Sequence, residues 1–376
     1  MKVKVIDIAT SGHREVYYKQ IANSFSTIGC EVQLFAPEGG DLSPDVLYTK
    51  LEVIKPISAN GKTLFSKIIN IIRSEYVRIK NLIRIRRKAK LSNTDFVFFA
   101  CLDDVLPTLL PAFIVGLLMN YRWSGLLVQS VLPRKSVFSP NIKRGLRAKK
   151  CTSVCVLNEY SVEEMREYND NVFVMPEFSY IADELSIYDL KTDYIQFGSQ
   201  PYTVCLLGSI HHRKGIDLLL EVARVLPADK FQFVVAGKSN LSREEEENLT
   251  LQANVQGNVV LSLHKIPDEY TFNSLIYKSD VVFAVYKDFY GSSNLLTKAA
   301  QMKKPVVVAK GHCMGRRVEM FDTGIAIESD DVNACADAIT YLCEGEKISN
   351  VCFEEYAQKH SISQLELCLQ AVIKEG

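Results

Sequence analysis

Short apolar runs alternate with longer mixed segments through the first 180 residues. Strands are predicted at Val3–Ile8, Glu31–Phe35, Phe96–Ala100, Leu126–Ser130, Ser153–Leu157 and Val172–Met175. A helix is expected from about Glu15 to Ile28, ended by Gly29. The longest apolar stretch, Val105 to Met119, is too short to span a bilayer and contains two prolines, so we expect a buried helix there. Strands separated by helices indicate a parallel sheet with crossover connections.

The pattern is interrupted between Ile181 and Gln200, which show neither strong periodicity nor an apolar run. A second series follows, with strands predicted at 202–207, 231–236, 259–261, 281–285 and 305–309, and helices at 216–226, 271–277, 295–303 and 363–373. We therefore predict an α/β protein with two Rossmann-like parallel-sheet domains, residues 1–180 and 201–362, facing an interdomain cleft. Residues 363–376 are expected to pack back toward the N-terminal domain.

Length and cysteine content agree with this picture. A chain of 376 residues exceeds what one hydrophobic core usually serves. The ten cysteines are scattered, without zinc-ligand spacing and without a signal sequence before them. Buried, reduced thiols in a cytoplasmic protein are therefore expected.

Charge separates the two halves, although the net charge of the chain is zero. Residues 1–180 hold 25 Lys and Arg against 17 Asp and Glu. Ten basic side chains and one acid, Glu75, are interleaved with large aliphatic residues at 62–90, and seven basic residues without an acid lie at 134–150. Such stretches suit an anionic membrane surface. A solvated helix face is the alternative. Nucleic acid is not expected, because no recognised motif is visible and aromatic residues are sparse there.

Two segments have the composition of phosphate-binding loops. The first runs from Gly208 through Ser209 to Arg213 and Lys214, between a predicted strand and a predicted helix. The second, Gly291–Asn294, follows the strand at 281–285 and opens the next helix with good N-capping residues. A polar loop and ordinary helix capping explain the same residues without any ligand. Two glycine-led helix starts at one end of a sheet favour an anion site.

These segments resemble the donor domain of GT-B glycosyltransferases of the family-4 (group 1) type. The resemblance covers about residues 201–345 and rests on Gly208–Gly215, Phe233–Gly237, Ser279–Phe283, Gly291–Asn294 and Lys304–Val308. It implies that Gly208, Ser209, Arg213, Lys214, Gly237, Tyr290, Gly291, Ser292, Ser293, Asn294 and Lys298 surround a nucleotide-sugar donor. It also implies that His264 and Ile266 lie beside the nucleotide base, although His264 is equally explained as a surface histidine.

Three positions depart from the family pattern. Ser209 stands where the family has an arginine, which leaves Lys214 in the family's lysine position and Arg213 as a substitute. Tyr290 and Lys298 stand where the family has two glutamates. The second glutamate ordinarily holds the donor ribose, and lysine cannot accept a hydrogen bond. Lys298 is expected to contact a phosphate or to lie on the helix surface.

Catalytic candidates in the first half follow two of its strands. Gly12 and His13 come after Val3–Ile8, where the family places a glycine loop, and His13 is a candidate base. Helix capping by Ser11 is the alternative. Asp103 and Asp104 come after Phe96–Ala100; they are candidate proton acceptors or helix caps. Glu159 is a further candidate from its position alone.

The predicted function is transfer of a sugar, hexosyl in kind, from a UDP- or GDP-sugar substrate. The acceptor is expected to be a glycan, either lipid-linked or a polysaccharide precursor, at the inner face of the membrane. No Asp-x-Asp motif stands out, so neither a metal nor a cofactor is expected. A nucleotide-sugar epimerase and a noncatalytic nucleotide-sugar-binding homologue remain as alternatives.

Overall fold

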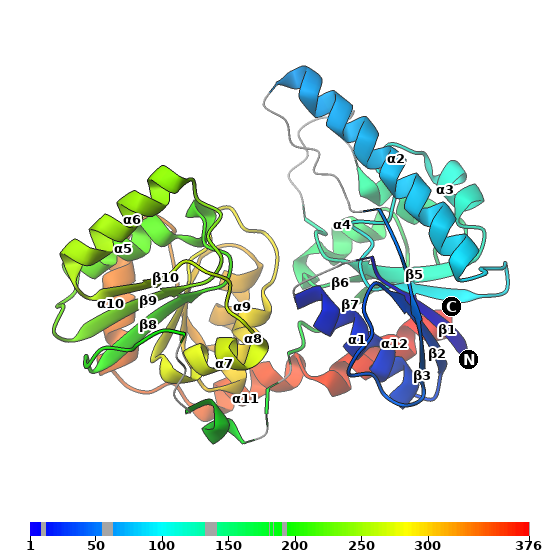
Figure 1. Ribbon diagram of the computed structural model, residues 1–376. Helices are drawn as coiled ribbons and strands as arrows, with labels where there is room; N and C mark the ends of the chain where they lie inside the picture. The colour runs from blue at the N-terminus through cyan, green and yellow to red at the C-terminus, as the bar shows by residue number, and fades with distance from the viewer. Residues whose placement is uncertain are drawn as a thin grey trace. The chain divides into compact units, whose positions relative to one another are not determined.

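The computed structural model describes residues 1–8, 13–54, 63–131, 141–179, 181–182, 184–189 and 194–375 (Figure 1). Contacts between residues divide the chain into two units. The first unit comprises Met1–Pro176 together with Ile362–Gly376, and the second comprises Glu177–Ser361. Each unit is built around one parallel sheet.

The first unit has a seven-stranded parallel sheet in the order β3-β2-β1-β4-β5-β6-β7. Its strands are β1 Lys2–Ile6, β2 Glu31–Ala36, β3 Val46–Lys50, β4 Phe96–Phe99, β5 Arg122–Leu127, β6 Val154–Val156 and β7 Val172–Val174. In the centre, Val5 pairs with Leu34 on one side and with Phe98 on the other. These three residues are fully buried, as expected for strands covered on both faces.

Helices of the first unit connect these strands (Figure 1). They are α1 His13–Thr27, α2 Leu64–Lys88, α3 Ala112–Leu118 and α4 Val162–Arg166, with 3₁₀ turns η1 Ile142–Arg147 and η2 Glu159–Ser161. The last helix, α12 Ile362–Glu375, also belongs to this unit and contacts α1 and β7. Its buried residues Leu365, Leu369 and Val372 recur at helical spacing and form the apolar stripe that packs there.

The second unit has a six-stranded parallel sheet in the order β10-β9-β8-β11-β12-β13. Its strands are β8 Tyr202–Leu207, β9 Phe231–Ala236, β10 Val259–Ser262, β11 Val281–Ala284, β12 Val306–Ala309 and β13 Gly324–Ile327. The strand order reverses between β8 and β11, as it does between β1 and β4 in the first sheet. Loops that follow the strands beside such a reversal commonly form ligand sites.

The helices of the second unit leave two apolar clusters against the sheet. They are α5 Ile216–Val225, α6 Arg243–Gln256, α7 Glu269–Lys278, α8 Asn294–Gln301, α9 Cys313–Phe321, α10 Val332–Glu344 and α11 Asn350–Lys359, with 3₁₀ turns η3 Leu185–Asp189 and η4 His212–Lys214. Successive residues of one strand enter different clusters. Leu206 belongs to one cluster and Leu207 to the other, because side chains alternate along a strand.

The expectation for the longest apolar stretch is wrong. The stretch from Val105 to Met119 is not one buried helix. Only Ala112–Leu118 is helical, because Pro107 and Pro111 interrupt the pattern, and Phe113 and Leu117 are each 70% exposed. In the part of the chain that the structure describes, no helix is both long enough and apolar enough to cross a bilayer.

The passage between the units also lies earlier than the interrupted segment at 181–200. The first unit ends at Pro176, because Glu177 is already held by the second unit. The Glu177 amide donates to His360 Nδ1 at 3.0 Å, and Thr297 Oγ1 donates to the Glu177 carbonyl at 2.6 Å. Burial, followed by the charges of Arg317 and Lys359, lowers the pKa of His360 to about 3, so its imidazole is neutral and can accept this bond.

Candidate functional site

Two glycines bring the carboxyl ends of β8 and β9 into close contact. Gly237 has φ +147°, and a Cβ atom placed there would lie 1.6 Å from the Gly208 carbonyl oxygen. Gly208 itself has φ +99°, and its amide donates to the Ala236 carbonyl at 2.9 Å. A side chain at Gly237 would force the strand ends apart, and the positive φ of Gly208 favours glycine there.

The loop after β8 is fixed against the end of β11. Gly215, with φ +77°, precedes α5, and a Cβ atom there would lie 2.4 Å from the Val285 carbonyl oxygen. The Lys287 amide donates to the Arg213 carbonyl at 2.8 Å. The loops that follow β8 and β11 therefore form one surface at the strand-order reversal.

Aromatic side chains orient the two cations of this surface. Lys214 Nζ lies 2.5 Å from the Tyr286 hydroxyl and 3.9 Å from the centroid of the same ring. Arg213 Cζ lies 5.3 Å from the centroid of Phe289, and the Tyr286 and Phe289 rings meet edge to face at 5.6 Å. Among the described residues, no carboxylate pairs with either cation. The arrangement presents two positive charges that are available to an anion.

The positive charge of this loop acts on its own histidines. Burial lowers the pKa of His211, and the nearby charges of Arg213 and Lys214 lower it further. His212 is held differently, since its Nδ1 lies 2.8 Å from Asp217 and its Nε2 lies 2.9 Å from Glu245. Hydrogen bonds to these two carboxylates raise the pKa of His212. His212 therefore ties the loop to the first turns of α5 and α6.

The Gly291–Asn294 turn lies next to the same aromatic residues. A Cβ atom at Gly291 would lie 3.1 Å from the Phe289 ring, and Tyr290 contacts His312 at 4.4 Å between ring centroids. Ser293 caps α8, accepting from the Leu295 amide at 3.4 Å. These contacts place the turn beside the loop that carries Arg213.

The Ser292 hydroxyl donates a hydrogen bond to the buried carboxylate of Glu177. The single hydrogen of this hydroxyl is therefore used within the protein. A phosphate bound at this turn would have to accept from the backbone N–H of Ser292 and not from its hydroxyl.

Lys298 does not occupy either of its expected places. Its side chain is only 1% exposed, pairs with Glu269 of α7, and donates to Asn273 Oδ1 at 2.7 Å. Burial lowers the pKa of Lys298, and the Glu269 carboxylate opposes this effect. Lys298 thus neither lies on the helix surface nor is available to bind a phosphate, because it belongs to the buried face of α8.

The remaining donor-site candidates of the second unit divide between the surface and the core. Ser209 is exposed, and its hydroxyl accepts from Asn240 Nδ2 at 2.5 Å. His264 is exposed, and its carbonyl accepts from the Tyr194 hydroxyl at 2.7 Å. Ile266 is 9% exposed and packs in one of the two core clusters. Its side chain is therefore a core residue rather than an open surface for a base.

The first-unit candidates are largely occupied or undescribed. Gly12 lies outside the described residues, and only the backbone of His13, the first residue of α1, is described. Asp103 accepts hydrogen bonds from the amides of Val128 at 2.8 Å and Gln129 at 2.9 Å. Burial raises its pKa against the effect of these bonds. Asp103 is thus a structural acceptor that joins the loops after β4 and β5.

Asp104 and Glu159 keep their positions after β4 and β6, Glu159 as the first residue of η2. Both residues have interaction partners within the protein. In the described ranges, no group of three or more His, Cys, Asp or Glu side chains is arranged to hold a metal ion. The structure therefore adds no metal-binding group to the candidate site.

Four residues of the site were missed by sequence reasoning. Tyr286 and Phe289 orient the cations, Glu269 neutralises Lys298, and Glu177 holds Ser292. The aromatic run in the loop directly after β11 was a usable signal for the first two. No signal in the sequence marked Glu177 or Glu269, because their partners lie 115 and 29 residues away along the chain.

Comparison with known proteins gives a consistent result. Residues 193–360 match the family model described as glycosyl transferases group 1. A search of curated protein sequences found no match.

Similar solved structures extend over the full length of the chain. Sucrose-phosphate synthase from Thermosynechococcus elongatus is 15% identical with a TM-score of 0.68, over 100% of this chain and 98% of that one. HepE from Anabaena, solved in complex with UDP-glucose, is 12% identical with a TM-score of 0.66, over 100% of both chains. WaaG, described as a glycosyltransferase involved in lipopolysaccharide biosynthesis, is 12% identical with a TM-score of 0.62, over 100% of this chain and 98% of that one. The chain therefore has the GT-B fold of two parallel-sheet domains, and residues 193–360, within its second unit, match the glycosyl transferases group 1 family.

Proposed function

We propose that this protein transfers a sugar from a nucleoside-diphosphate sugar to an acceptor, and that the second unit binds the donor. The observation that carries the proposal is the pair Arg213 and Lys214, held by aromatic rings at the strand-order reversal without a carboxylate partner among the described residues. The HepE structure, which contains UDP-glucose, supports a nucleotide sugar as the ligand class.

The chemical role of this cationic pair follows from the charge that develops during sugar transfer. Cleavage of the bond between sugar and diphosphate leaves negative charge on the diphosphate. Fixed positive groups stabilise that charge without reorganising during the reaction. Lys214 carries three N–H donors and uses one on Tyr286, so it can also donate to a phosphate oxygen. Two fixed cations can carry this role without a metal ion, and we propose a metal-independent reaction.

Glu269 is the candidate group for binding donor hydroxyls. Lys298 cannot accept a hydrogen bond, but it pairs with the carboxylate of Glu269 in the first turn of α7. The Glu269 side chain is 40% exposed and can therefore be reached by a ligand. In this proposal Glu269 takes the place of the glutamate that the family has at the position of Lys298. The acid has moved to a neighbouring helix, and the buried lysine positions it.

The proposed acceptor is a lipid-linked glycan or a polysaccharide precursor at an anionic membrane surface. The outward face of α2 carries exposed Phe65, Ile68, Ile72 and Tyr76, at spacings that place them on one side of the helix. Glu75, the acid of this helix, is turned inward and accepts from the amides of Thr108 at 2.8 Å and Leu109 at 2.9 Å.

The outward face of α2 is consequently basic and apolar, which suits binding in the plane of an anionic bilayer surface. The basic stretch at 134–150 offers less. Residues 132–140 lie outside the described residues, Lys143 is buried against Glu164, and Arg147 covers Tyr168. The free thiols of all ten cysteines fit a reducing compartment, in line with action at the cytoplasmic face of the membrane.

Calorimetric titration of the purified chain with UDP, GDP and ADP tests the donor site. One nucleotide is expected to bind, and the Lys214→Ala variant is expected to bind it at least about tenfold more weakly, as for the loss of a charged hydrogen bond. Lys230→Ala is the matched control. Lys230 directly precedes β9, at the end of the sheet opposite to the donor-site loops, and pairs with Glu344. Equal binding by wild type and Lys214→Ala would contradict the assignment.

A further inference from the structure

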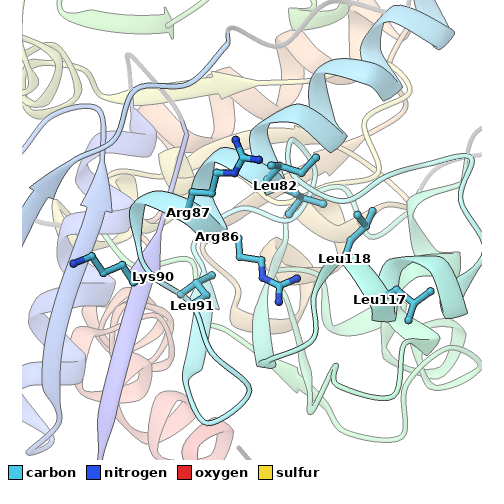
Figure 2. Close-up of a pocket in the computed structure, with 8 residues that line it drawn as sticks. Leu82, Arg86, Arg87, Lys90, Leu91, Leu117 and Leu118 are labelled. Carbon is cyan, nitrogen blue, oxygen red and sulfur yellow. The ribbon is translucent and has the colours of Figure 1, made fainter.

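A groove of about 410 Å³ lies in the first unit, where the C-terminal end of α2 meets α3 (Figure 2). It is separate from the donor-site loops, all of which belong to the second unit. Its lining combines leucine and isoleucine side chains with three cations. Among the residues that the structure describes, no acid lines it.

The apolar lining of this groove is continuous with the core of the first unit. Leu82 and Leu91 are buried members of that core, and Leu118 packs against it. Leu117, on the last turns of α3, is 70% exposed and forms part of the opposite wall. An apolar chain laid in the groove would cover Leu117 and the part of Leu118 that now faces water, beside the buried Leu82 and Leu91.

Three cations, Arg86, Arg87 and Lys90, also line the groove, and their side chains point in different directions (Figure 2). Within the described ranges, none of them pairs with a carboxylate. Basic residues in a last helical turn also balance the helix dipole, but that dipole amounts to only about half a charge. Three cations therefore leave the groove positive, a charge complementary to that of a phosphate group.

The position of the groove continues the outward face of α2. Ile83, which lines the groove, is exposed and lies on the same side of the helix as Ile72 and Tyr76, since these residues are spaced by multiples close to 3.6. If this face lies on a bilayer, the cations of the groove come to the level of the lipid phosphates, and its leucines to the level of the acyl chains.

We propose that this groove binds one anionic phospholipid of the membrane. The positive charge of Arg86, Arg87 and Lys90 attracts its anionic headgroup, and an acyl chain covers Leu117 and Leu118. The inference rests on the membrane association within the proposed function, and it is independent of the nucleotide site. It turns a general attraction to negative surfaces into a defined lipid site.

The test uses the full chain and dihexanoyl phosphatidylglycerol below its micellar concentration, titrated by calorimetry. Saturable binding at one site is expected. Arg86→Gln/Arg87→Gln/Lys90→Gln should weaken it at least about tenfold, because each cation near a lipid phosphate contributes to the affinity. Arg73→Gln/Lys80→Gln/Arg84→Gln is the matched control, since it removes three charges from exposed positions of the same helix outside the groove. Equal losses in both triple variants would overturn a defined site.

Two further probes distinguish a site for an anionic lipid from a site for any lipid or any anion. Dihexanoyl phosphatidylcholine and inorganic phosphate are each expected to bind at least about tenfold more weakly than phosphatidylglycerol, because one lacks net charge and the other lacks an apolar chain. Comparable binding of either probe would overturn the proposal.

Leu117→Ser should weaken lipid binding, whereas Leu251→Ser, a similarly exposed leucine of the second unit, should not. Leu117 is exposed, so its replacement tests the apolar wall without disturbing the core. Nucleotide binding is measured on the same samples. If the wild type binds a nucleotide but no lipid, the lipid site is rejected and the proposed function is not. If the wild type binds no nucleotide, the proposed function is rejected.

Discussion

The two units share a strand order but use the loops at its reversal in different ways. In the second unit, the loops after β8 and β11 expose Arg213 and Lys214, which are held by aromatic rings and have no acid partner among the described residues. In the first unit, the loop after β4 carries Asp103, whose two carboxylate oxygens accept backbone amides of the neighbouring loop. Topology marks where a site can form, but side-chain availability decides whether a charged residue serves a ligand or the fold.

The largest expected effect concerns the second unit. Lys214→Ala should lower kcat/KM for sugar transfer about 10²- to 10³-fold, as for removal of one fixed donor from a developing negative charge. Steady-state kinetics with the nucleotide sugar identified by calorimetry measures this effect. Lys230→Ala should keep a nearly normal kcat/KM. A similar loss of kcat/KM in that variant would show that the effect of Lys214→Ala is not specific to the proposed donor site.

Glu269→Gln tests whether the buried lysine depends on its partner. Without the acid, Lys298 keeps the neutral groups of Asn273 and Phe272, so its buried charge is poorly compensated. We expect a loss of about 3 kcal/mol in the free energy of unfolding, measured with urea. Glu244→Gln, at an exposed position of α6, should cost little.

A double variant sharpens this test. Replacing Lys298 by methionine in the Glu269→Gln background removes the charge and should recover most of the lost stability. If the double variant is no more stable than Glu269→Gln, the ion pair is not what stabilises this region.

Asp103→Asn tests the contrasting role in the first unit. Asparagine offers one acceptor oxygen where the carboxylate offers two, so one of the amides of Val128 and Gln129 loses its partner. The free energy of unfolding should fall by about 2 kcal/mol, with a smaller change in kcat than in stability. Asp170→Asn, at an exposed position, is the control. A large loss of kcat at unchanged stability would return Asp103 to the catalytic candidates.

The smallest expected effect is a dependence on pH at His212. Its two carboxylate partners raise its pKa above 6.5, so the stabilisation is complete below about pH 6.5 and is lost as the pH rises through the raised pKa. The side chain is 54% exposed, and solvent screening limits the effect to less than about 1 kcal/mol. Unfolding measured at about pH 6 and pH 8 should differ more for wild type than for His212→Gln. The same difference in both proteins would assign the pH dependence to other groups.

Much of the fold and part of the site could be predicted from local patterns. The alternation of apolar strands and helices predicted two parallel sheets and all their strands except β3 and β13. The group 1 resemblance agrees with the match over residues 193–360. Gly208, Gly237 and Gly215 were recognisable, since a glycine between a strand and a helix indicates close backbone approach. These signals are local because strand burial and backbone conformation depend mainly on neighbours along the chain.

Only the tertiary structure decided which polar side chains remain available. Nothing near Lys298 in the sequence indicates that α7 supplies Glu269, and nothing near Asp103 indicates that the next strand's loop supplies two amides. The same holds for Glu177, whose carboxylate accepts a hydrogen bond from the hydroxyl of Ser292, 115 residues further along the chain. The sequence determined most of the strands, the alternation of strands with helices and the glycine turns, because these follow from periodicity and backbone conformation. Partners of buried charges depend on how elements pack, and a buried charge binds the nearest complementary group, whatever its distance along the chain.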